Sequence, residues 1–184
     1  TATIGNLDGL IAANDSGQLP ALTTRRDAHG VAATIDNKYV HNVDRIRNVV
    51  EVFDTSNYAK YTYDLVSEDG KGNGFGACMD ASVNDDPNFP ANDPAPDLLE
   101  STPDGKYLMI GLRGPTPVSV THSAQGSCPG VGVVELTEDG SSGRLVGVLR
   151  ASNTIDTADT NAPGGHAYSG AERSDIHAAT VISK

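Results

Sequence analysis

Three side chains that could bind a metal ion share one position in a repeated pattern. Residues 175–181 echo residues 27–33, so His177 corresponds to His29. Residues 34–40 match residues 102–108, an offset of 68 residues, and the same offset aligns Asp97 with His29. Two imidazoles and a carboxylate suit a divalent ion such as Zn²⁺, or Cu or Fe, because nitrogen and carboxylate oxygen donors satisfy it without thiolates. The pattern predicts a metal site if the fold brings the three residues together.

The same pattern offers a carboxylate beside each histidine. Asp27 and Asp175 lie two residues before His29 and His177. In a strand they would share a side with the imidazole, where they could orient it or balance the charge of the ion. The alternative interpretation is structural: the imidazole of an Asp-x-His pattern hydrogen-bonds the neighbouring backbone.

An acidic segment offers oxygen donors. No basic residue occurs between Lys71 and Lys106, and carboxylates at this density could hold Ca²⁺ and order a long loop. The candidate calcium ligands are Asp80, Asp85, Asp86 and Asp93. Their spacing does not match the EF-hand loop, and a hydrated acidic loop without an ion is the alternative interpretation.

The two cysteines predict a disulfide. Cys78 and Cys128 lie in glycine-rich, polar contexts, GFGACMD and QGSCPGVG, where a bridge between loops is expected more than an inert core thiol. The bridge would stabilise the fold by about 4 kcal/mol in the chain-entropy model. It would indicate a secreted or periplasmic protein. Two unpaired thiols in a reducing compartment are the alternative.

The composition limits the class of partner. The 184 residues hold 13 Lys and Arg against 24 Asp and Glu, a net charge of −11, which argues against nucleic acid. No apolar run approaches the roughly 18 residues of a membrane-spanning helix, so we expect no membrane span. The 20 Gly and 10 Pro favour turns over long helices.

Eight short runs rich in β-branched and aromatic residues predict strands. They are residues 31–35, 39–43, 48–53 and 58–66, then residues 98–101, 106–112, 132–136 and 145–150. Residues 102–105 (TPDG) fit a type I hairpin turn. The pattern predicts two four-stranded antiparallel meanders in an all-β fold.

The two meanders align with each other. Residues 34–40 (TIDNKYV) match residues 102–108 (TPDGKYL). Insertions rich in Gly and Pro interrupt the strand runs. In stacked meanders these insertions would emerge on one face, which would bring Cys78 and Cys128 to the same side. Arg45, Arg47 and Arg113 follow second strands, and we expect them to pair with the acidic insertion or to bind an anionic ligand.

Three stretches carry a family resemblance. They are DLLESTPDGKYLMIGLRGP at residues 97–115, PGVGVVEL at residues 129–136 and GRLVGVLR at residues 143–150. They resemble the YVTN-type repeat of β-propeller proteins, which include lactonase-like propellers, and the resemblance covers roughly residues 27–184. It implies four-stranded blades whose innermost strands begin at the mouth of a central channel. In lactonase-like propellers the metal at this position has carboxylate and amide donors, so the histidine pair departs from that pattern.

These features predict that the chain forms a partial β-propeller with long loop insertions on one face. The predicted parts are a remnant of a preceding blade at 1–26, a blade at 27–68, an acidic insertion at 69–96, a blade at 97–152 with an insertion at 114–130, an insertion at 153–174 and the first strand of a further blade at 175–184. About two blades cannot close a ring. We expect another polypeptide chain to complete the propeller.

These features support two functional hypotheses of different classes. The first is an extracellular or periplasmic binding and assembly scaffold, whose long-loop face contacts another protein chain or a glycan. The second is a metal-dependent enzyme, a lactonase-like hydrolase or a metal redox protein, with its site at His29, Asp97 and His177. Its candidate cofactor is a divalent metal, Zn, Cu or Ca. No G-x-S-x-G nucleophile motif is present.

Overall fold

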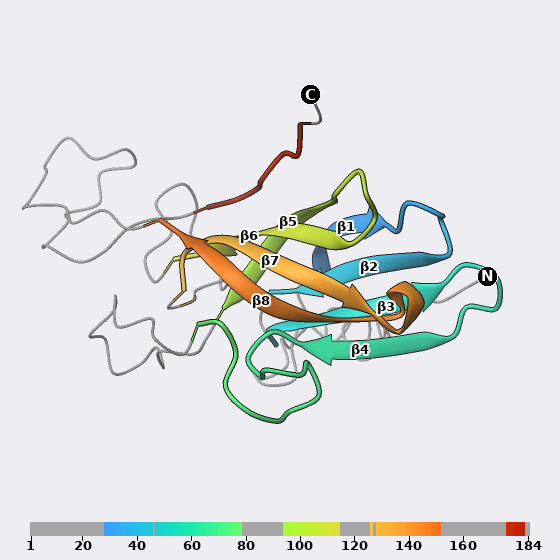
Figure 1. Ribbon diagram of the computed structural model, residues 1–184, viewed down its shortest axis with the longest axis horizontal. Helices are drawn as coiled ribbons and strands as arrows, with labels where there is room; N and C mark the ends of the chain where they lie inside the picture. Colours follow the sequence, from blue (N-terminus) through green and yellow to red (C-terminus); the bar gives the residue numbers. More distant parts are fainter. Residues whose placement is uncertain are drawn as a thin grey trace, which may run out of the picture.

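The protein folds into two four-stranded antiparallel sheets (Figure 1). The computed structural model describes residues 28–45, 47–78, 94–114, 126, 128–151 and 176–182. The first sheet contains, in spatial order, β1 (Ala28–Ala33), β2 (Tyr39–Asp44), β3 (Val49–Asp54) and β4 (Lys60–Asp64). The second contains β5 (Ala95–Ser101), β6 (Tyr107–Arg113), β7 (Gly130–Thr137) and β8 (Ser142–Arg150). A 3₁₀ turn, Glu138–Gly140, joins β7 to β8.

The described strands confirm the all-β class and both predicted meanders. All eight predicted strand runs are present. The fourth is shorter than predicted, because Tyr58 adopts a left-handed φ of 62° in the β3–β4 turn and its N–H bonds to the carbonyl oxygen of Asp54. Neither sheet closes on itself within the described residues. None of these residues belongs to a helix long and apolar enough to cross a membrane.

The two aligned turns have the same hydrogen bonds. In each, a threonine hydroxyl accepts a bond from the N–H of the tyrosine five residues later and donates one to the aspartate between them. The distances are 3.0 and 2.6 Å for Thr34, with Tyr39 and Asp36, and 3.1 and 2.6 Å for Thr102, with Tyr107 and Asp104. Each turn needs a positive φ at the same position, which Asn37 supplies in one and Gly105 in the other. The sequence repeat is therefore a structural repeat.

The core lies between the two sheets. β1 packs against β5 and β4 against β8, and the strands of the two sheets form adjacent layers (Figure 1). Alternate residues of each strand face this core, as period two requires. The fully buried ones include Val43, Val50 and Val52 in the first sheet and Leu108, Ile110 and Leu112 in the second.

A buried polar cluster crosses this core. His41 Nε2 lies 2.9 Å from the carbonyl oxygen of Gly140, and its Nδ1 lies 3.2 Å from the Tyr63 hydroxyl. A carbonyl only accepts, so Nε2 carries the proton and Nδ1 accepts from Tyr63. Burial lowers the pKa of His41 to about 4 and raises the pKa of Tyr63. The imidazole is neutral at pH 7 and ties the β7–β8 turn to the first sheet.

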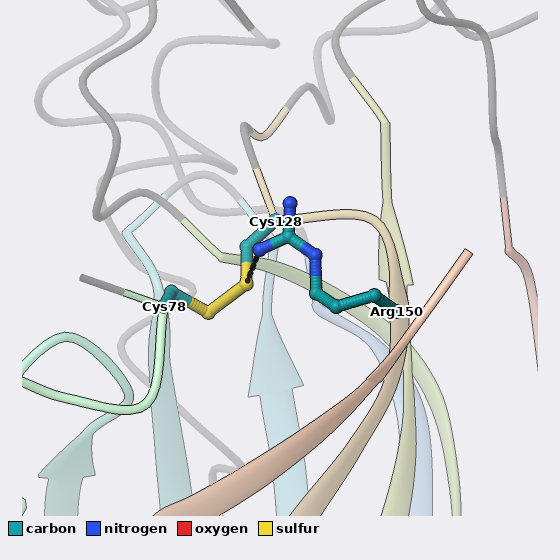
Figure 2. The surroundings of a disulfide bond; sticks show 3 residues. All are labelled: Cys78, Cys128 and Arg150. Atoms are coloured by element: carbon teal, nitrogen blue, oxygen red, sulfur yellow. Dashed lines mark hydrogen bonds between the residues drawn. A yellow bond between two sulfur atoms is a disulfide. The ribbon is translucent and has the colours of Figure 1, made fainter. Parts of the chain in front are cut away.

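The predicted disulfide is present. Cys78 and Cys128 are bonded, with their Cα atoms 5.8 Å apart, and both are fully buried (Figure 2). The guanidinium of Arg150 donates to Cys128 Sγ over 3.4 Å. The bridge joins the segment that follows β4 to the residue that closely precedes β7. It therefore crosslinks the two sheets at the end where their long connections begin.

Residues 176–182, predicted to begin a further strand, form no strand. A strand needs a hydrogen-bonded ladder with a neighbour, and the described chain places no such ladder beside them. They nevertheless lie against the second sheet. The N–H of Leu98 donates to the carbonyl oxygen of His177 over 3.0 Å, and the N–H of Val181 donates to Glu100 Oε2 over 3.0 Å.

Candidate functional site

The fold brings the three predicted metal-site residues together around one carboxylate. His29 comes from β1, Asp97 from β5 and His177 from the segment 176–182. His29 Nε2 lies 3.1 Å from Asp97 Oδ1, and His177 Nδ1 lies 3.1 Å from Asp97 Oδ2. The repeated position in the sequence is thus a point of convergence in space.

Two matching irregularities allow this convergence. The β1–β2 register shifts between Ala28 and Val31, and the β5–β6 register shifts between Pro96 and Leu99. These bulges turn the strands at the aligned position. Close approach of β1 to β5 also needs Gly30, where a Cβ atom would lie 2.2 Å from the carbonyl oxygen of Asp97.

Two arginines hold the same carboxylate. Arg113 Nη1 lies 2.5 Å from Asp97 Oδ2, and Arg45 Nη1 lies 3.4 Å from Asp97 Oδ1. Both arginines are buried and Asp97 is fully buried. A buried carboxylate needs such partners, because burial of an unpaired charge costs several kcal/mol, of the order of 3–5.

The sequence predicts that Arg45 and Arg113 pair with the acidic insertion at 69–96 or bind an anionic ligand, and it does not predict that they share Asp97 of β5. A signal was available in the spacing: Arg113 follows Asp97 by 16 residues, and Arg45 follows His29 by the same interval. The repeat therefore includes an arginine at the end of each second strand as well as the residue at the start of each first strand.

The hydrogen bonds assign donor and acceptor roles to the contacting ring nitrogens of both histidines. Arg113 Nη1 lies 2.5 Å from His177 Nε2, and a guanidinium only donates, so Nε2 is the acceptor and Nδ1–H donates to Asp97. His29 donates to Asp97 through Nε2–H. The imidazoles are 38% and 45% exposed, so they form the solvent side of a buried ion cluster.

This cluster is an ion-pair network in which the predicted metal donors already have partners. A divalent ion would compete with two guanidinium groups for Asp97 and with Arg113 for His177. Among the described residues, no group of three His, Cys, Asp or Glu side chains is arranged to hold a metal ion. A metal at His29, Asp97 and His177 stays a prediction.

Other predicted site residues lie outside the described residues. These are Asp27 and Asp175, and the candidate calcium ligands Asp80, Asp85, Asp86 and Asp93. The described residues on either side of the long connections still show where these connections attach to the sheets. β4, β6 and β8 end, and β5 and β7 begin, at the end of the sheets that carries Asp97.

Comparison with known proteins gives no further assignment. No family model, curated protein or solved structure matches this chain.

Proposed function

We propose that this protein is a binding and assembly module of a larger β-propeller, in which the second sheet receives a further sheet on its outer face. The observation that carries the proposal is the position of residues 176–182. They lie against β5 and β6 as β5 lies against β1 and β2. The packing of the second sheet on the first thus begins to repeat on the outer face of the second sheet.

Two details of this stacking recur one repeat later. The carbonyl oxygen of Asp97 lies against Gly30 of β1, and the carbonyl oxygen of His177 accepts a hydrogen bond over 3.0 Å from the N–H of Leu98, which aligns with Gly30 at the offset of 68 residues. Gly111 of β6 allows the backbone of His177 to approach, because a Cβ atom there would lie 2.4 Å from its carbonyl oxygen. Arg45 at the end of the first repeat's second strand bonds Asp97, and Arg113 at the aligned position bonds His177. These recurrences support the proposal that the third aligned segment corresponds to an innermost strand.

The outer face of the second sheet carries apolar side chains that a partner could bury. It presents the residues that alternate with the buried ones, namely Tyr107, Met109, Val131, Val133 and Leu149. Leu149 is 64% exposed. Apolar side chains along neighbouring strands favour burial against a partner, at about 25 cal/mol for each Å² removed from water. The partner that fits is polypeptide that extends residues 176–182 into a sheet.

The disulfide supports an extracellular or periplasmic location, because such bonds persist in oxidising compartments. It also supports a rigid platform for the long connections, since it joins the sheets at the end where these connections attach. Binding through this long-loop face, to a protein chain or a glycan, is the second part of the proposal.

Substitution on the outer face tests the proposal. Leu149→Asp should leave the fold intact, because the side chain is exposed, and should reduce the mass of the native assembly measured by light scattering. Phe75→Asp is the matched control, because Phe75 is 65% exposed but lies in the loop after β4. An assembly whose mass is insensitive to Leu149→Asp, or falls equally with Phe75→Asp, would count against it.

The convergence of His29, Asp97 and His177 favours one alternative, a metal-dependent enzyme of the lactonase-like or redox class. Its test is calorimetric titration with Zn²⁺ and Cu²⁺. Stoichiometric binding that is lost in both His29→Ala and His177→Ala would favour the enzyme over the scaffold. No saturable binding would leave the scaffold.

A further inference from the structure

The outer strand of the first sheet leaves part of its backbone without a partner. β4 (Lys60–Asp64) is the last strand in the order β1-β2-β3-β4, and no described strand pairs with its other side (Figure 1). Residues 60–62 are all exposed, and Tyr61 is 43% exposed. Tyrosine and threonine in this segment favour extended structure. An exposed edge strand of this kind is a template for pairing with another strand.

The ladder with β3 shows which backbone groups of β4 point outward. The N–H of Leu65 donates to the carbonyl oxygen of Asn48 over 3.0 Å, in register with the β3–β4 pairs. Bonded and non-bonded pairs alternate in an antiparallel ladder, so every second residue counted back from Leu65 bonds to β3. The N–H and C=O groups of Lys60 and Thr62 therefore point away from the sheet, and none of the described residues bonds to them.

This outward row has defined ends. The N–H of Asp64, which also points outward, donates to the carbonyl oxygen of Gly70 over 2.9 Å, so the loop after β4 covers the edge at this residue. At the other end, Tyr58 turns the chain with a φ of 62°. Residues 60–62 are thus the free edge of β4.

The strand β4 lacks the features that protect an edge from pairing. It contains no proline, and its register with β3 has no shift, so no bulge turns it away. A lysine on an edge opposes a second strand, but the buried carboxylate of Glu51 holds the ammonium of Lys60 at 2.8 Å. β8, the outer strand of the second sheet, differs, because its ladder with β7 shifts register between Val133 and Val134.

We propose that the free edge of β4 pairs with the same edge of a second copy of this chain. In the antiparallel register centred on Tyr61, Lys60 lies opposite Thr62 of the second copy, so the outward N–H and C=O groups of both copies are satisfied. No like charges lie directly opposite each other, and each Lys60 keeps its own Glu51. The edge is its own complement, which favours a second copy over an unrelated strand. The two first sheets become one continuous sheet.

The centre of this register is an aromatic contact. The two Tyr61 side chains lie opposite each other, where the Cβ atoms of a strand pair are about 4.5–5.5 Å apart. Within one copy, the Tyr61 ring already contacts Tyr39 edge-on, with ring centroids 6.3 Å apart. This contact restricts the ring before pairing and lowers the entropic cost of association.

Sedimentation velocity of the purified full chain over a concentration series tests the pairing. We expect saturable association that ends at the mass of two chains. Thr62→Pro removes the outward N–H but no bond to β3, and should weaken association at least about tenfold. Thr62→Ala is the matched control, because it keeps the N–H, and should leave association unchanged. A chain that stays monomeric at every concentration, or equal weakening by both variants, would overturn the proposal.

Tyr61→Lys tests the same contact if Thr62→Pro does not fold. It places two ammonium groups opposite each other at the centre of the register and should weaken association at least about tenfold. Tyr58→Lys is its control, because Tyr58 is 69% exposed but lies in the turn before β4. Equal effects of the two lysine variants would also overturn the pairing.

Leu149→Asp separates this contact from the proposed assembly face. Dimers that persist in Leu149→Asp and are lost in Thr62→Pro support pairing through β4. The reverse pattern would overturn it and leave the proposed function standing. A photoreactive phenylalanine analogue at Tyr61, in a mixture of isotope-labelled and unlabelled chains, tests the register. It should link to residues 59–63 of the other copy, and links within one copy only, or to another surface, would contradict the pairing.

Discussion

Protonation of the buried His41 should destabilise the fold in mild acid. The pKa of the imidazole is lowered from 6.5 to about 4 by burial, against a smaller opposing effect of its bond to Gly140. Because the folded-state pKa lies below the unfolded one, stability is complete above pH 6.5 and is lost as the pH falls toward 4. This difference between the folded and unfolded pKa corresponds to a loss of about 2 kcal/mol at pH 5 and about 3 kcal/mol at pH 4.

Urea unfolding at pH 7.5 and pH 5 measures this loss, with His41→Gln as the reference. Glutamine does not titrate in this range and can still donate to the Gly140 carbonyl. Carboxylate titration affects both proteins and cancels in the comparison. The wild type should lose about 2 kcal/mol more than His41→Gln between the two pH values. A difference below about 0.5 kcal/mol would refute the neutral, buried imidazole and, with it, the rigid anchor of the β7–β8 turn.

Three further substitutions test the connections between the repeats. Asp97→Asn leaves Arg113 buried beside a neutral amide and should cost about 3 kcal/mol in urea unfolding; a cost near zero would contradict the buried ion cluster. Replacing both bridged cysteines by alanine should cost about 4 kcal/mol in the same assay, and an unchanged midpoint would show that the bridge adds nothing. Gly111→Ala should push away the backbone of His177 and speed amide exchange in the β5 bulge, whereas Gly147→Ala, with open space around its Cβ position, should not; equal exchange in both variants would count against the packing of residues 176–182.

The sequence predicted the parts of the fold that depend on local chemistry. The two repeated turns follow from a Thr-x-Asp pattern with Asn37 or Gly105 at the left-handed position, and all hydrogen bonds of this motif lie within six residues. The alternating strand residues and the disulfide could be predicted for similar reasons, since period two and glycine-rich contexts are visible in a single sequence.

Contacts between distant residues could not be predicted in the same way. The bond of His41 to the Gly140 carbonyl spans 99 residues and depends on how the sheets stack, which no local pattern specifies. The two arginines at Asp97 are a similar case, although their equal spacing from the aligned residues offered a clue. Residues 176–182 form no strand despite a strand-like sequence, because the ladder depends on a neighbour and not on the segment alone.

Photo-crosslinking from Leu149 tests the central claim most directly. A photoreactive phenylalanine analogue at this position, in the protein as it is assembled in its own cells, should crosslink to a strand-like polypeptide segment identified by mass spectrometry, and the analogue at Phe75 should not. This result would place a further sheet on the outer face of the second sheet. Crosslinks to solvent only, or the same products from both positions, would contradict the account.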